Sequence, residues 1–379
     1  MGYPDPDPVG QHPGTAGSDI VARARGQARR LLLSAAHTDR EGLTRAALDG
    51  LGQAGLLGLA APPEWGGTAA STAEWREVAE TLMAADGTAW FCWSQHHALV
   101  RTLAAARVSD DLPHVGDLRR DLLPALASGA AVAAVAFSHA RRSGPPALVA
   151  EPAPGGWTLH GTVGWVTAWD IADVVMVLAE ADGRLLHFVL PTEPTVGLDI
   201  GPPHRLLAMS GSHTRPLAFA GVVVPDRLLV AAIDRPMWLS IDRVLAAQPP
   251  PAAFGLARGA LSSMATLSDA PEPDRLGDVL SHVADETRAL REACYSAVDT
   301  YDPRGSALPD LVGLRARAIA LAARVAAIAM AARGPAGLLS GSADERRCRE
   351  AAFLSVFRQG GPSRSALLDL WSVSPLPRD

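Results

Sequence analysis

Residues 161–173 read GTVGWVTAWDIAD and stand between a turn at 154–156 and the apolar run VVMVLA at 174–179. The β-branched composition of that run suits a buried strand. Trp165 and Thr167 are two residues apart, so on a strand their side chains point to the same face. Taken alone, such a face is either part of the core, which is the commoner case, or the wall of a pocket.

The composition is that of an ordinary globular protein with enough apolar residues for a sizeable core. The chain has 379 residues, of which 48% are hydrophobic and 20% charged, and this length suggests two or three domains. The net charge is −6, and all 34 basic residues are Arg without forming a basic tract. We therefore expect neither a nucleic-acid partner nor a membrane partner.

The cysteines and the hydropathy pattern bear on the cellular compartment in which the protein works. Cys92, Cys294 and Cys348 lie far apart without metal-ligand spacing, so we expect no metal site and a reducing, cytoplasmic environment. No stretch has the layout of a signal peptide, and no run of 18 apolar residues is free of charge.

Two helical regions flank a region rich in strands. We expect disorder over 1–17, an N-terminal helical domain over 18–128, a central β-domain over 129–230 and a C-terminal helical bundle over 231–379. Gly55 is a plausible C′ glycine of the second helix. The helices expected from periodicity and breakers are 19–36, 40–54, 72–85, 88–106, 118–127, 236–267, 274–301, 307–333, 343–357 and 363–371.

Three motifs in chain order resemble the acyl-CoA dehydrogenase superfamily. They are GLLGLAAPPEWGG at 55–67, the stretch at 161–173, and RLLAMSGSHTRPLAFAGVVVP at 205–225. The resemblance implies an α+β fold with a helical domain, a β-barrel-like domain and a helical bundle. It also implies an acyl thioester substrate, carried on CoA or a carrier protein, and FAD as cofactor.

The resemblance assigns flavin contacts to five residues. Trp165 and Thr167 match the Trp and Thr that pack against the flavin in this family. Phe137 and Ser138 occupy the position whose residues hydrogen-bond the flavin, and Ser143 matches the phosphate-binding Ser with a shift of one residue.

Other cofactor determinants of the family are altered. The glycines of this motif are replaced by His and Arg, so close backbone approach is lost. Arg141 and Arg142 either grip a phosphate by charge or form a solvated strand end. The segment 267–277, LSDAPEPDRLG, stands where the family has a loop that holds the FAD of a neighbouring subunit. FAD is therefore implied by the family, while its presence in this chain stays open.

The usual catalytic carboxylate is missing. Nine residues after Arg349, where the family most often has its catalytic Glu, this chain has Arg358, and the alternative position holds Thr214. Neither side chain accepts a proton from an acyl α-carbon at working pH. The candidate substitutes are the histidines His96, His97 and His139.

Two arginines are candidates for substrate binding. Arg215 aligns with an Arg beside the thioester site of the family. Arg358 either points into the cleft, where it grips a carboxylate or phosphate, or is solvated at a helix end before Gly360.

The segment 90–97, WFCWSQHH, also allows two interpretations. It is either a helix with an aromatic core face, or a helix from which one His reaches the acyl pocket. His96 and His97 point about 100° apart on a helix, so they do not easily share a metal ion.

Three functions remain open at this stage. The first is a divergent flavoprotein oxidoreductase, a dehydrogenase or a monooxygenase that needs no α-proton acceptor. The second is an inactive subunit of a hetero-oligomer, completed by a homologue that has the base. The third is a cofactor-free acyl-binding protein. A homodimer or homotetramer is the assembly that the resemblance implies.

Overall fold

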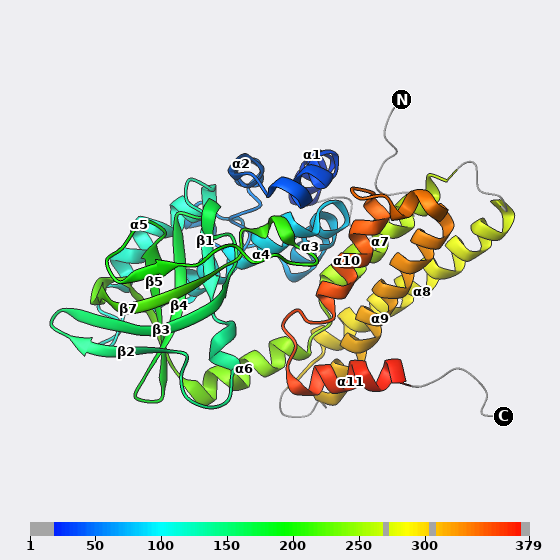
Figure 1. The fold of residues 1–379 in the computed structure, drawn as a ribbon. Helices are drawn as coiled ribbons and strands as arrows, with labels where there is room; N and C mark the ends of the chain where they lie inside the picture. The colour runs from blue at the N-terminus through cyan, green and yellow to red at the C-terminus, as the bar shows by residue number, and fades with distance from the viewer. Residues whose placement is uncertain (1–18, 268–272, 303–307, 373–379) are drawn as a thin grey trace.

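The computed structural model describes residues 19–267, 273–302 and 308–372, and these form three structural groups (Figure 1). Helices of the N-terminal third pack beside a central sheet, and most of the helices that follow the sheet gather away from it, at the right of Figure 1, with N-terminal helices in between. The expected α+β architecture of helices, sheet and helices is confirmed. The predicted disorder of 1–17 lies outside the described residues, and the domain limits at 128 and 230 stay predictions.

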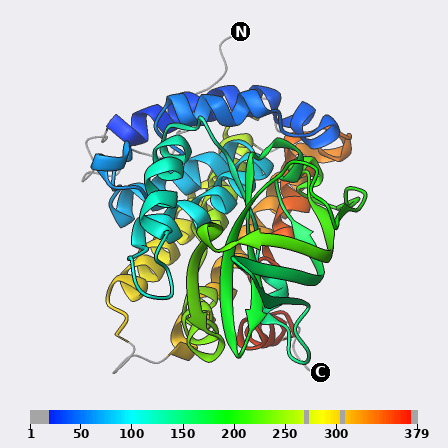
Figure 2. The ribbon, with the colours of Figure 1, turned by 90° about the vertical axis from the view of Figure 1, so that its left-hand side faces the viewer.

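The N-terminal helices follow the expected positions with two changes. The first helix continues to Glu41, and the second begins only at Arg45, because Gly42 takes a φ of +104° between them. Gly55 has a φ of +71° and follows the second helix as predicted. The helices are α1 (Asp19–Glu41), α2 (Arg45–Gln53), α3 (Thr72–Ala85), α4 (Gly87–Ala105) and α5 (Val115–Ser128). Figure 2 shows α1 running across this group, with the sheet toward the viewer.

The central sheet is mixed, and its strands lie in the order β6-β7-β3-β2-β4-β5-β8, with β1 paired to β4. An antiparallel bridge between Val135 and Thr167 also joins β1 to the end of β3, so β3, β2, β4 and β1 close a ring. The strands are β1 (Ala133–Ala136), β2 (Leu148–Ala153), β3 (Gly156–Val166), β4 (Val174–Ala181), β5 (Arg184–Pro191), β6 (Leu198–Ile200), β7 (Arg215–Pro225) and β8 (Leu229–Asp234).

The C-terminal helices contain one break that the sequence prediction missed. A single helix over 236–267 is wrong, because Pro249, Pro250 and Pro251 interrupt it. Proline lacks the N–H of a helix interior and disfavours helical backbone in the residue before it. The helices are α6 (Arg235–Ala247), α7 (Pro251–Ala265), α8 (Pro273–Asp299), α9 (Leu308–Arg333), α10 (Ala343–Leu354) and α11 (Gly361–Ser372). In Figure 1, α6 leads from the sheet toward these helices.

Apolar side chains form separate cores for the helices and for the sheet, with a third core between them. The third core packs α4 and α5 against strands through residues such as Leu103, Leu123, Val135 and Met176. It fixes α4 against the sheet, which positions the cavity described below. Within the described residues, no helix is both long and apolar enough to cross a membrane.

In the turn after α2, one glycine is required because there is no space for a side chain at its position. The backbone N–H of Thr68 donates to Gly58 O at 3.1 Å, and the N–H of Ala69 donates to Ala61 O at 2.9 Å. These bonds draw Gly67 against the preceding chain, so a Cβ there would meet Ala61 O at 2.0 Å. Its neighbour Gly66 has open space around its Cβ position but a φ of +79°.

The neighbouring glycines should therefore differ in their tolerance of alanine. Gly67→Ala should lower the free energy of unfolding by about 3 kcal/mol, since backbone must move to relieve the clash. Gly66→Ala should cost only about 1–2 kcal/mol of left-handed strain. Gly26→Ala, at an exposed and uncrowded position of α1, is the control and should stabilise by about 1 kcal/mol. Urea unfolding of the three variants measures these values, and equal costs at 66 and 67 would contradict the packing argument.

Candidate functional site

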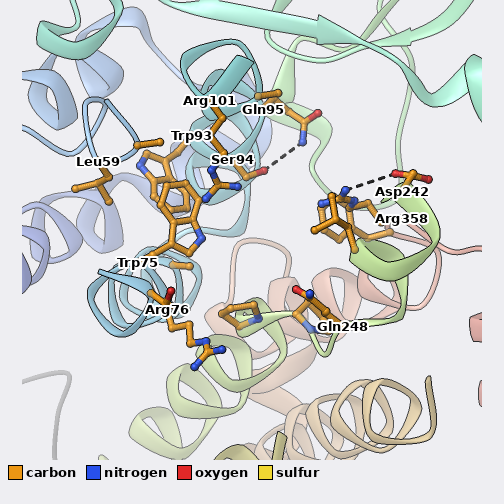
Figure 3. A pocket seen from close by; sticks show the side chains of 18 of the residues that line it. Leu59, Trp75, Arg76, Trp93, Ser94, Gln95, Arg101, Asp242, Gln248 and Arg358 are labelled. Carbon is orange, nitrogen blue, oxygen red and sulfur yellow. Dashed lines mark hydrogen bonds and ion pairs between the residues drawn. The ribbon is translucent and has the colours of Figure 1, made fainter. Parts of the chain in front are cut away.

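A cavity of about 670 Å³ lies where α3, α4, α6 and the start of α7 face β4 and β5 (Figure 3). Its size is that of a pocket for a small molecule or part of a cofactor. Aromatic rings make up much of its wall, and they belong to Trp75, Trp90, Trp93, Phe137, Trp238, Tyr295 and Phe357.

The charges on the cavity wall are unequal in number. Four arginines line it, whereas Asp242 is the only carboxylate among the described lining residues. Arg76 has its own partner outside the wall, Asp299, with two hydrogen bonds of 2.7 and 2.8 Å. Arg101, Arg315 and Arg358 are left with Asp242 as the one negative charge on that wall.

Asp242 is held chiefly by Arg141, which comes from the 3₁₀ turn Ser138–Arg141 after β1. The Nε and Nη2 of Arg141 donate to the two carboxylate oxygens at 2.6 and 2.7 Å. Nη2 of Arg358 lies 3.5 Å from Oδ1. Burial by itself raises the pKa of Asp242, but the hydrogen bonds and charge of Arg141 and the charge of Arg358 outweigh it and lower that pKa. Asp242 is therefore ionised at neutral pH.

Arg315 is a buried cation supported by backbone. Only 2% of its surface is exposed, and its Nη1 and Nη2 donate to the carbonyls of Gln248 and Phe357 at 2.8 and 2.5 Å. Its Nε has no partner among the described residues. Burial, together with the charges of Arg358 and Arg141, lowers its pKa to about 10, which leaves it charged at neutral pH.

Arg358 belongs to the cavity and not to the solvated end of a helix. The helix expected to reach 357 ends at Leu354, and Arg358 has a φ of +48° in the segment that follows. Its side chain lines the cavity beside Asp242 (Figure 3). Burial and the charge of Arg141 lower its pKa, while Asp242 acts in the opposite direction.

The three histidines considered as substitute bases do not line this cavity. Nδ1 of His96 accepts the N–H of Ala133 at 3.1 Å, and Nδ1 of His97 lies 2.9 Å from the carbonyl of Trp93, to which it donates. Nε2 of His139 lies 2.6 Å from the carbonyl oxygen of Leu178. All three are buried, and burial lowers each pKa. The expectation that one of them reaches the pocket is not met, because α4 turns its His residues into the core.

A different histidine, His187 on β5, does line the cavity and was missed in the sequence. Its surface is 5% exposed, and neither ring nitrogen has a partner among the described residues. Burial lowers its pKa to about 4. The run Leu185–Leu190 marks a strand, and a lone His inside it gave no signal of a site.

Of the residues that the resemblance assigned to a flavin, Phe137 lines the cavity. Ser138 follows it at the start of the 3₁₀ turn. The antiparallel bridge between Val135 and Thr167 brings the end of β1, which Phe137 follows, beside the end of β3, which carries Trp165. This end of the sheet thus brings together Phe137, Ser138, Trp165 and Thr167.

Trp165 and Thr167 differ in exposure, although a regular strand would give both the same face. Trp165 is 48% exposed with its ring centroid 4.6 Å from that of His204, so it is not a core residue. Thr167 is buried and accepts a hydrogen bond from the hydroxyl of Thr214 at 3.3 Å. The strand ends at Val166, and Ala168 turns the chain with a φ of +66°.

The residues proposed for a pyrophosphate do not form a cradle in the described structure. Ser143 and Arg142 are exposed, and neither lines the cavity. Arg141 is occupied by Asp242. The interpretation as a solvated strand end fits Arg142, which is exposed. Arg141 instead pairs with Asp242, a role that the sequence did not suggest.

Thr214 and Arg215 also lie away from the cavity wall. The hydroxyl of Thr214 is buried, 2.8 Å from that of Ser212. Arg215 binds Asp170 at 2.8 Å and donates to the carbonyl of Gly201 at 3.0 Å. Neither placement supports a direct role at the substrate.

Asp242 is the functional candidate that sequence reasoning did not single out. Trp238, Asp242 and Leu245 are spaced i, i+4 and i+7 on α6 and all line the cavity. That spacing marks one face of a helix. An acid on an otherwise apolar face was the signal available, and the misplaced helix limits of 236–267 obscured it.

Comparison with known proteins identifies related chains. Residues 18–130 match the family model described as "Acyl-CoA dehydrogenase, N-terminal domain". A "Probable acyl-CoA dehydrogenase" of Bacillus subtilis is 28% identical over 48% of this chain and 31% of its own length. The chain spans between 31% and 49% of the length of the curated relatives it matches.

Two solved structures share the fold over nearly the whole chain. Butyryl-CoA dehydrogenase from Megasphaera elsdenii superposes with a TM-score of 0.78 at 18% identity, covering 96% of this chain and 100% of its own. A glutaryl-CoA dehydrogenase from Mycobacterium smegmatis, in complex with FADH2, has a TM-score of 0.74 at 18% identity and covers 95% of each chain. At these identities the likeness shows the fold alone.

The buried His187 should make stability depend on pH. Its pKa is about 4 in the folded chain and near 6.5 when unfolded, so its contribution is present above pH 6.5 and is lost as pH falls toward 4. His187→Leu should therefore gain about 2 kcal/mol in unfolding free energy relative to the parent between pH 8 and pH 5. Urea unfolding at both values tests this, and a difference that does not change with pH would show that His187 titrates normally.

Proposed function

The chain belongs to the acyl-CoA dehydrogenase superfamily, and we propose that it binds an acyl thioester in the cavity as a flavin-dependent oxidoreductase. We further propose that Asp242, not residue 358, takes the proton from the acyl group. The observation that carries this proposal is that Asp242 is the single carboxylate among the described residues of the cavity wall, which also presents aromatic rings and guanidinium groups.

The end of the sheet offers a surface suited to the flavin ring. The Trp165 side chain is half exposed at the end of β3, Phe137 lines the cavity from the segment after β1, and the bridge between Val135 and Thr167 joins these two segments. An exposed indole offers an aromatic surface for stacking a planar ring. The exposed Ser143 and the occupied Arg141 show no such fit for the pyrophosphate. When bound, a flavin supplies the acceptor for a hydride.

Proton removal requires a base that is ionised at working pH. Arg358 is a permanent cation, whereas Asp242 is ionised because Arg141 and Arg358 lower its pKa. The guanidinium of Arg358, which lines the cavity, also favours negative charge that develops on the acyl group. Asp242, on α6, thus supplies a carboxylate in place of the missing Glu, from a different part of the cavity wall.

Assembly is part of the proposal. Members of this family work as oligomers, and we propose a homodimer or homotetramer for this chain. The alternatives are a base-deficient subunit beside a complete homologue and a cofactor-free acyl-binding protein. A colourless protein that ignores added FAD would favour these alternatives over the oxidoreductase.

Flavin binding should depend on the exposed indole. Trp165→Ala should weaken FAD binding at least about tenfold, since loss of stacking on an aromatic ring costs roughly 1–1.5 kcal/mol or more. Trp371→Ala on α11, where the indole is 52% exposed, is the matched control and should bind like the parent. Titration of apoprotein followed by visible absorbance gives both constants. Unaltered binding by the Trp165 variant would place the flavin elsewhere.

Acyl oxidation should depend on Asp242. Asp242→Asn should lower kcat by about 10²–10⁴-fold while retaining thioester binding, because the amide cannot accept the proton. Asp170→Asn, which alters an ion pair away from the cavity, should retain activity. In the parent enzyme the acid limb of the pH profile should lie below the ordinary range of an aspartate, since the hydrogen bonds and charge of Arg141 and the charge of Arg358 lower the pKa of Asp242. A variant with parental kcat would exclude Asp242 as the base.

A further inference from the structure

The cavity holds more positive charge than the chain neutralises. Arg101, Arg315 and Arg358 face it, and Asp242 is the only carboxylate among its described lining residues. Arg101 stacks over the ring of Trp75 at 3.8 Å instead of pairing with an acid. Arg101 is exposed, so the cations enclosed in the wall are the buried Arg315 and the partly buried Arg358. Enclosing guanidinium groups without equal negative charge is unfavourable, so such a site is suited to an anion.

Asp242 does not occupy all the N–H donors of the guanidinium groups on the cavity wall. Both of its oxygens are engaged by Arg141 at 2.6 and 2.7 Å, whereas Arg358 stands off at 3.5 Å. Charge-assisted hydrogen bonds are normally 2.7–2.9 Å long, so the contact with Arg358 is loose. The Nε atoms of Arg315 and Arg358 are buried without a partner in the described structure. The Arg358 side chain is 31% exposed, so its terminal amino groups, which are only loosely paired with Asp242, are the donors within reach of a ligand.

We propose that the acyl group of the substrate carries a second carboxylate, and that Arg358, supported by Arg315, binds it. The substrate class is a thioester of a short dicarboxylic acid. This inference rests on the proposed function, because it uses the same cavity and the same base. Planar bidentate guanidinium groups are suited to carboxylates, and Arg358 sits in the position to select them.

The closeness of the two groups limits the length of the acyl chain. Arg358 Nη2 and Asp242 Oδ1 are 3.5 Å apart. A carboxylate on Arg358 and a carbon facing Asp242 must then be separated by only a few bonds. A phosphate of the carrier does not meet this condition, because the pantetheine arm separates it from the thioester. Arg315, at 2% exposure, also lies deep in the wall rather than at an entrance.

Calorimetric titration of the FAD-supplemented protein can test this with matched thioesters. The probes are malonyl-, succinyl-, glutaryl- and adipyl-CoA, each compared with its monomethyl ester, which has the same chain but lacks the charge. We expect at least one of the shorter acids to bind tenfold or more tightly than its ester. Arg358→Gln should remove that difference, and Arg358→Lys should restore part of it.

Arg243→Gln is the control, since it alters an exposed arginine next to Asp242 on the same helix and should preserve the selectivity. Acids and esters that bind equally would overturn the dicarboxylate inference and leave the proposed function standing. If no thioester binds, the proposed function fails as well. If Arg358→Gln weakens CoA alone or FAD as much as the acids, the arginine serves a phosphate and the inference is overturned. Thermal unfolding of each variant verifies that it is folded.

Discussion

The ion pair between Arg141 and Asp242 is the interaction on which the arrangement of the site depends. It joins the turn after β1 to α6, and it brings Asp242 beside Arg358 from the segment after α10. Three parts of the chain, about a hundred residues apart in sequence, thus meet at one carboxylate. Removing one partner of such a buried pair leaves an uncompensated charge, which is far costlier than losing an exposed pair.

The proline break at 249–251 determines how α6 and Arg315 contribute to the cavity wall. It ends α6 and begins α7, so that the Trp238, Asp242 and Leu245 face of α6 can line the cavity while α7 packs in the helical core. The carbonyl of Gln248, which the break frees from helical bonding, accepts the guanidinium of Arg315. An interrupted helix here supplies both a wall residue and an acceptor for a buried cation.

The sequence was sufficient for the architecture because helical periodicity and strand alternation are local. Gly55, the capped start at Thr72 and the strand around 174–179 all appear where local rules place them. The site was harder, since its residues converge only through tertiary packing. Phe137, assigned by the resemblance to the flavin, and Arg358, whose placement the sequence left open, both line the cavity, whereas His96 and His139 are turned into cores. Asp242 and His187 carry no motif, and their significance emerges only from what surrounds them.

An arginine in place of a catalytic glutamate changes the electrostatics of a site without necessarily ending its chemistry. A carboxylate at 358 would repel Asp242, so the two positions cannot both be ionised acids at low cost. With Arg358 present, Asp242 is ionised, and the basicity it loses through a lowered pKa is offset by stabilisation of the charge formed when the proton leaves. The same guanidinium that prevents residue 358 from acting as a base helps to keep Asp242 ionised, as the proposed base must be, and it leaves the cavity wall with excess positive charge, on which the proposed dicarboxylate preference rests.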